Sequence, residues 1–253
     1  MKAVRYLPCD ALKPFIKAFL LLGSGDGMQN LLLPDTSLVA AFRLRGEVEQ
    51  AGEQLPLSVI TGLRRSAREV SYAKESAMLL VQFHDGGAAA FTRLPMHELF
   101  NASVPLDQIF APQEIRDLET QLATAQHDAQ RIAFAERFFL SKLRLSQPDL
   151  RIRSAIAQIR STGGDISITA LAQSACLSQD AFEKKFRSHV GASPKRFAAT
   201  VRFREMLSRY TPELSLTRLA YLGGYFDQSH FIRDFRSFTG RAPHEFFLSS
   251  RYW

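Results

Sequence analysis

The sequence predicts an α+β protein with a β-rich amino-terminal domain and an all-α carboxy-terminal domain. Three observations support this prediction. Short apolar runs separated by turn residues fill the first hundred positions, helical periodicity begins near Ala111, and two segments in the last hundred residues repeat one another. We therefore expect a β-rich domain at residues 1–110, a helical connector at 111–148 and a helical domain at 149–253.

Charge divides the chain near the same boundary. The 253 residues have a formal net charge of +7. Residues 1–150 carry 16 Lys and Arg against 17 Asp and Glu, whereas residues 151–253 carry 16 against 8. A polyanion such as nucleic acid, or an anionic membrane surface, is the natural partner for a domain with this excess of positive charge.

Strands are expected in the first domain where apolar runs are bounded by turn formers. These runs are residues 31–34, 37–46, 57–62 and 77–83. Phenylalanines in this half are expected to be core, although they could also line a pocket for a small molecule. They are Phe15, Phe19, Phe42, Phe83 and Phe91.

The connector reads as two helices in a hairpin. Pro112 stands at a first helical turn, and apolar residues follow at helical spacing in both halves. They are Ile115, Leu118 and Leu122, then Ile132, Phe139 and Leu143. These apolar faces either pack within the domain or form a dimer seam, and the sequence leaves both alternatives open.

The helical domain contains an internal repeat. Residues 166–197 align with residues 214–246 once the second copy is given one extra residue in its turn. Each copy reads as a short helix, a tight turn and a second helix capped by Ser178 or Asp227, which is a helix-turn-helix pattern. Matched pairs include Leu171 with Leu219, Gln179 with Gln228, Phe182 with Phe231, Phe186 with Phe235, Gly191 with Gly240 and Pro194 with Pro243.

A further helix is expected between the two copies. Ser193 and Pro194 begin it, and Phe203, Met206 and Leu207 share one of its faces. A continuous helix would hold the two copies at a fixed separation. If each second helix enters a major groove on the same face of DNA, their centres lie about 34 Å, or roughly 10 base pairs, apart.

The second helix of each copy supplies candidate groove-facing residues. Arg can make a bidentate contact to guanine and Gln to adenine, each worth ~1–3 kcal/mol of discrimination. In the second copy the candidates are Gln228, Ser229, His230 and Arg233. In the first copy they are Gln179, Asp180, Glu183 and Lys184, a less basic set that we expect to bind more weakly or more selectively.

Basic residues beside these helices suit contacts to DNA phosphates, which position a protein without specifying sequence. They are Arg187, Lys195, Arg196 and Arg236. The alternative for each is a solvated charged face.

The spacing of the second copy matches a known signature. It consists of Gly224, Tyr225, Ser229, Phe231, Arg233 and Phe235, followed by Gly240 and Pro243. On these residues, positions 151–250 resemble the DNA-binding domain of AraC/XylS-type bacterial transcription regulators. The resemblance implies seven helices, a long linker helix, and base readout led by Lys184 and Arg233. Two departures stand out: Cys176 occupies a turn position where the family usually has Gly, and would be strained there if φ were positive, while Tyr225 replaces the usual Phe.

The first half more faintly resembles the small β-rich sensor domain of such regulators. Residues 31–37, residues 81–99 and the helical pair support this resemblance. It implies a cupin-like or related β-barrel with effector-sensing or oligomerising duties.

We therefore expect a cytoplasmic, sequence-specific transcription regulator with double-stranded DNA as its partner. The resemblance implies an activator, with RNA polymerase, a small-molecule effector and a second copy of the chain as further partners, although the sequence does not show whether transcription is raised or lowered. The alternative is an architectural protein that binds DNA without sequence preference. Nonspecific binding falls with salt, whereas specific binding exceeds it ~10³-fold or more.

Other classes lack their motifs. No hydrolase, nucleotide-binding or dehydrogenase motif occurs, so no enzyme activity and no cofactor are expected. His84 and His97 have no metal-ligand spacing, and Cys9 with Cys176 form no disulfide framework, which suits a reducing compartment. No run is long enough for a membrane span, and the amino terminus is not a persuasive signal peptide.

Overall fold

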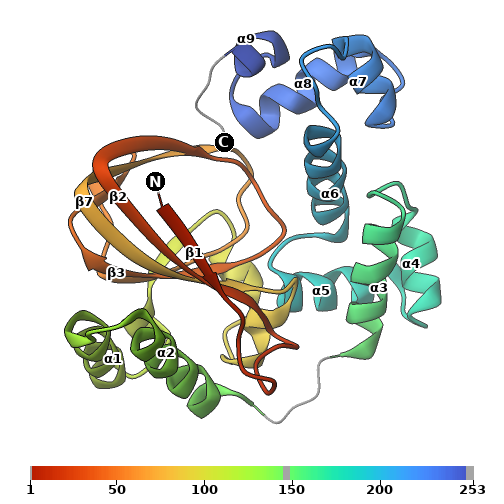
Figure 1. Ribbon diagram of the computed structural model, residues 1–253. Helices are drawn as coiled ribbons and strands as arrows, with labels where there is room; N and C mark the ends of the chain where they lie inside the picture. Colours follow the sequence, from red (N-terminus) through yellow and green to blue (C-terminus); the bar gives the residue numbers. More distant parts are fainter. Residues whose placement is uncertain (1, 145–148, 249–253) are drawn as a thin grey trace.

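The computed structural model describes residues 2–144 and 149–248, in which a curled β-sheet lies beside an array of helices (Figure 1). The predicted α+β class and the β-rich amino-terminal domain are confirmed. The strands are β1 (Lys2–Tyr6), β2 (Ile16–Leu32), β3 (Val39–Arg45), β4 (Val48–Gln50), β5 (Glu53–Gln54), β6 (Ser58–Thr61), β7 (Arg68–Phe83) and β8 (Ser103–Pro105).

The sheet is antiparallel and follows the order β1-β2-β7-β3-β6-β8, with β4 beside β7 and β5 beside β4. The long strands β2 and β7 pair from Ile16 with Phe83 to Leu32 with Arg68. Residues 31–34 were predicted as a separate strand, but β2 begins at Ile16 and ends at Leu32. The glycines within β2 resemble turn residues in the sequence, yet β2 pairs with β7 on both sides of Gly25 and Gly27 and remains one strand, so tertiary pairing overrides local propensity.

Short helices and the predicted hairpin complete the first half. The 3₁₀ helices are η1 (Gly87–Ala90), η2 (Met96–Leu99) and η3 (Leu106–Gln108), and the hairpin consists of α1 (Pro112–Thr124) and α2 (Asp128–Lys142). Ile115, Leu118 and Phe139 of the hairpin are buried in the same cluster as Phe19 and Phe42 of the sheet. The hairpin therefore uses its apolar faces within the domain.

The second half contains helices and no strand among its described residues. Its helices are α3 (Leu150–Ser161), α4 (Ile168–Ser174), α5 (Gln179–Val190), α6 (Pro194–Ser208), α7 (Leu216–Leu222), α8 (Gln228–Thr239) and α9 (Pro243–Leu248). These are the seven helices that the resemblance implies, and α6 is the long linker helix between the two helical pairs (Figure 1).

The hydrophobic core does not divide at residue 149. One buried cluster runs from the sheet through α1 and α2 into the first helical unit, where it includes Phe182, Phe186 and Phe197. A second cluster surrounds α8, and Leu31 and Leu33 of the amino-terminal domain pack against it. Both helical units therefore contact the β-domain through apolar side chains.

Candidate nucleic-acid interface

The two helix-turn-helix units are built from the same capping interactions. Ser178 begins α5, where its hydroxyl accepts from the Ala181 amide at 3.3 Å, and Asp227 begins α8, where its carboxylate accepts from the His230 amide at 2.6 Å. Each cap satisfies a backbone donor that the first helical turn leaves free. Gly191 and Gly240 end these helices in the left-handed conformation. The caps predicted at Ser178 and Asp227 are confirmed.

Helix α8 divides cleanly into a packing face and an outward face. Phe231, Phe235 and Phe238 are fully buried. The four predicted groove-facing residues are all exposed: Gln228, Ser229, His230 and Arg233. Each side chain is accessible to a partner, and its role in base readout stays a prediction.

Helix α5 presents a more constrained outward face. Gln179, Asp180 and Lys184 are exposed, whereas Glu183 is half-buried. The Gln179 side chain already has two partners, because its Nε2 donates to Glu183 Oε1 at 3.0 Å and its Oε1 accepts from the Thr169 hydroxyl at 3.0 Å. Lys184 is an exposed cation on this helix, and its role in base readout stays a prediction.

The basic residues predicted to contact phosphates separate into two groups. Arg187, Lys195 and Arg236 are exposed. Arg196 is half-buried; its guanidinium lies 4.2 Å from the ring centroid of Phe238 and donates to the Arg65 carbonyl. Burial lowers the pKa of this guanidinium, with a smaller contribution from neighbouring Arg65. In this conformation Arg196 joins α6 to α8 and to the β-domain.

Helix α6 connects the cores of the two units. Near its start, Phe197 packs against Phe186 of α5 with the ring centroids 5.6 Å apart. Near its end, Phe203 stacks on Phe238 of α8 at 4.5 Å and contacts Phe235 at 5.7 Å. At 1.5 Å per residue, its 15 residues span about 22 Å. One straight helix thus fixes the distance and orientation of α5 relative to α8.

Both residues that depart from the family pattern have structural consequences. Cys176 has φ +52° in the turn between α4 and α5, and Gly224 has φ +71° at the matching position of the second unit. The Cys176 turn therefore needs the positive φ that the sequence raised as a source of strain. The Tyr225 hydroxyl donates to Asp234 Oδ2 at 3.1 Å, an interaction that sequence reasoning missed because the residues lie on different elements.

Polar contacts join the β-domain to both units. Asp85 forms an ion pair with Arg160 of α3 at 2.6 Å, and Asp35 forms one with Arg204 of α6 at 3.4 Å. The Ala67 amide donates to the carbonyl of Phe238 in α8 at 2.7 Å. These contacts connect the β-domain to α3, α6 and α8.

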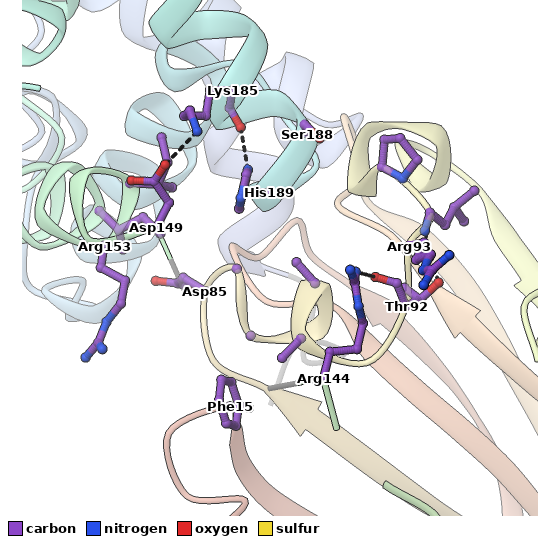
Figure 2. Close-up of a pocket in the computed structure, with 18 of the residues that line it drawn as sticks. Phe15, Asp85, Thr92, Arg93, Arg144, Asp149, Arg153, Lys185, Ser188 and His189 are labelled. Carbon is purple, nitrogen blue, oxygen red and sulfur yellow. Dashed lines mark hydrogen bonds and ion pairs between the residues drawn. The ribbon is translucent and has the colours of Figure 1, made fainter. Parts of the chain in front are cut away.

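A cavity of about 480 Å³ lies between the β-domain and the first unit (Figure 2). Phe15 and the segment around η1 form one wall, and α3 and α5 form the other. Lys185 Nζ donates to Asp149 Oδ2 at 2.6 Å, and the His189 ring nitrogen Nδ1 lies 2.9 Å from the Lys185 carbonyl oxygen. Of the five phenylalanines expected in the core, Phe15 is the one that lines this cavity; the other four are buried, and they are Phe19, Phe42, Phe83 and Phe91.

The two histidines of the amino-terminal half that were considered as metal ligands lie on separate segments. His84 follows β7, whereas His97 lies in η2. No group of three or more His, Cys, Asp or Glu side chains in the described part of the chain is arranged to hold a metal ion. Nor does any described helix combine the length and apolarity needed to cross a membrane.

Comparisons with known proteins match both halves of the chain. Residues 171–249 match a family described as a helix-turn-helix domain, and residues 4–105 match a domain of unknown function, DUF6597. A search of curated proteins finds no significant match. The first match confirms the predicted helix-turn-helix domain.

Solved structures with similarity to this chain include ToxT from Vibrio cholerae, with 11% identity over 90% of this chain and 96% of that chain at a TM-score of 0.48. ToxT bound to an unsaturated fatty acid has 13% identity over 90% and 94% of the two chains, with a TM-score of 0.45. The AraC-like transcriptional activator CuxR has 13% identity over 87% and 90%, with a TM-score of 0.25.

Proposed function

We propose that this chain, whose residues 171–249 match the helix-turn-helix family, is an AraC-type DNA-binding transcription regulator that recognises a two-part operator, with α5 and α8 reading successive major-groove segments. The observation that supports this most is the aromatic packing of α6 against both reader helices. A spacer that packs into both units holds the readers in one geometry, and a fixed geometry selects for a fixed separation of the two DNA segments.

The exposed cations of the two reader helices suit direct contact with bases. We assign the leading base contacts to Lys184 on α5 and Arg233 on α8, since both are exposed and face away from the phenylalanine cores. Arg187, Lys195 and Arg236 flank them and suit phosphates. Arg196 is assigned the lesser role in DNA contact, because its guanidinium has partners within the protein.

We also propose that the regulator responds to a small molecule bound in the interdomain cavity. Its volume of about 480 Å³ lies within the range of small-molecule sites. Arg93 and Arg153 line it without an acidic partner among the described residues, which favours a molecule that carries negative charge. Since Lys185, Ser188 and His189 of α5 form part of the wall, such a molecule would touch the first reader helix directly.

Coupling between the cavity and DNA binding can be tested without knowing the molecule. Ala89→Trp would fill the cavity from the η1 side, and Ala129→Trp on the exposed face of α2 is the matched control. We expect only the cavity variant to change the affinity for the selected operator. Equal affinity in both variants would contradict the coupling.

The central test is selection of bound DNA from a random pool by the full chain at two salt concentrations. Recovery of a motif with two blocks about one helical turn apart is the expected result. A pool that stays random, with affinity that collapses as salt rises, would instead support an architectural protein without sequence preference. A regulator of this kind would act on chromosomal DNA in the cytoplasm, and RNA polymerase or a second copy of the chain would be its natural protein partners.

A further inference from the structure

The second helix-turn-helix unit contains one residue that the first unit lacks. The turns of the two units close alike: the Leu177 amide donates to the Ala172 carbonyl at 3.0 Å, and the Tyr225 amide donates to the Ala220 carbonyl at 3.1 Å. In the first unit the helix cap Ser178 follows Leu177 directly. In the second unit Phe226 stands between Tyr225 and the cap Asp227. Phe226 is therefore the inserted residue.

Phe226 is placed unlike the other phenylalanines of its unit. Its surface is 98% exposed, whereas Phe231, Phe235 and Phe238 are at 0%. Among the described residues it is the sole exposed phenylalanine. An aromatic ring left in water forgoes the stabilisation that burial would give it, so neither packing nor turn closure accounts for it.

Phe226 lies just before the start of α8, the second reader helix. It precedes the cap Asp227 and the exposed residues Gln228 and Ser229. Helix-turn-helix proteins place the amino-terminal residues of this helix against base edges in the major groove. A side chain that projects from the residue before the cap lies at the border of the bases that α8 would read.

The chemistry of the major groove leaves few partners for an uncharged aromatic ring. Hydrogen-bond donors and acceptors line the groove, and its one apolar group is the 5-methyl of thymine, with which phenylalanine makes favourable contact. We propose that Phe226 is a specificity-determining residue whose ring packs on the 5-methyl group of a thymine beside the segment read by α8. This inference rests on the proposed function, because it requires α8 to enter a major groove.

The test replaces each thymine of the selected operator beneath the second unit by deoxyuridine, which removes only the methyl group. With the full chain, we expect one position at which affinity falls about fourfold, the equivalent of one buried methyl-sized group. Phe226→Ala should bind the thymine and deoxyuridine duplexes equally at that position, and Phe226→Leu should retain part of the preference. Since Phe226 is exposed, the variants should unfold at the urea concentration of the parent protein.

Tyr221→Ala provides the matched control, because Tyr221 is a second exposed aromatic residue, 71% accessible, on the preceding helix α7. This variant should keep the preference for thymine. If a two-block operator is recovered but Phe226→Ala discriminates thymine from deoxyuridine as the parent does, the inference fails and the proposed function stands. If Phe226→Ala keeps all DNA affinity and loses transcriptional output alone, the ring serves a protein partner, and the inference is overturned. If no operator is recovered, the proposed function fails, and this inference fails because it depends on that function.

Discussion

Replacement of Cys176 by glycine should stabilise the first helix-turn-helix unit. Cys176 is exposed and has φ +52°, a left-handed conformation that costs a residue with a side chain roughly 1–2 kcal/mol. Glycine removes that cost but makes the unfolded chain more flexible, which offsets about 0.4–1 kcal/mol. The difference predicts that Cys176→Gly raises the free energy of unfolding by about 0.5–1 kcal/mol.

Two further variants isolate the backbone as the cause. Cys176→Ala keeps a side chain in the left-handed conformation, so its stability should stay within about 0.5 kcal/mol of the parent protein. Gly224→Ala at the matching turn should be destabilising by an amount similar to the gain from Cys176→Gly. A Cβ added at Gly224 would meet nothing within 4 Å, so crowding would not contribute to the loss.

Urea unfolding followed by far-ultraviolet circular dichroism measures these differences, provided that all variants are compared at one protein concentration. The expected order of stability is Cys176→Gly above the parent protein, with Cys176→Ala beside the parent. Equal midpoints for the glycine and alanine variants would refute the strain at Cys176.

Three other predictions concern the reader helix α8, its turn and the start of α3. Arg233→Ala should relax base preference at one operator position by about 1–3 kcal/mol, whereas Arg236→Ala should weaken binding to every duplex alike and lower the salt slope by about 1; titrations of operator variants at several salt concentrations distinguish the two. Tyr225→Phe removes the hydroxyl that donates to Asp234 and should lower the free energy of unfolding by about 1 kcal/mol, so an unchanged urea midpoint would contradict a stabilising role for this bond. Hydrogen bonds from two basic side chains lower the pKa of Asp149, so its carboxylate stabilises the fold above the ordinary Asp pKa of 3.8, and this contribution is lost as the pH falls below that value. Asp149→Asn should therefore flatten the pH dependence of the unfolding midpoint below about pH 4. An unchanged pH dependence in this range would contradict a stabilising role for the ion pairs of Asp149 with Arg151 and Lys185.

The helical half could be predicted because its signals are local. A cap, two phenylalanines four residues apart and a terminal glycine occur in both copies, and each acts within a few residues. The same logic found α6, since Pro194 marks its start and its apolar residues recur at helical period. Repetition strengthened the interpretation, because two copies that share a spacing share a structure.

Features that depend on distant contacts were not predictable in this way. Strand β2 contains glycines that interrupt the sequence pattern, and its pairing with β7, some fifty residues away, keeps it continuous. Arg196 looked like a surface cation, yet its guanidinium packs on Phe238 and reaches the Arg65 carbonyl. The ion pair of Asp85 with Arg160 joins the β-rich domain to the helical domain, and no sequence pattern indicates that these two residues are neighbours. Each of these depends on where another segment lies, which composition and periodicity do not encode.

The fixed separation of the two reader helices is the central claim, and changing the operator spacing tests it most directly. Binding of the full chain would be measured on the selected operator and on versions with 5 or 10 base pairs inserted between its two blocks. Five base pairs turn the second block to the opposite face of DNA, and ten restore the face but add about 34 Å, which a helix of about 22 Å cannot span. The rigid α6 spacer predicts that both insertions reduce affinity to that of a single block. Full affinity on the operator with ten added base pairs would show that the readers move independently and would contradict the account.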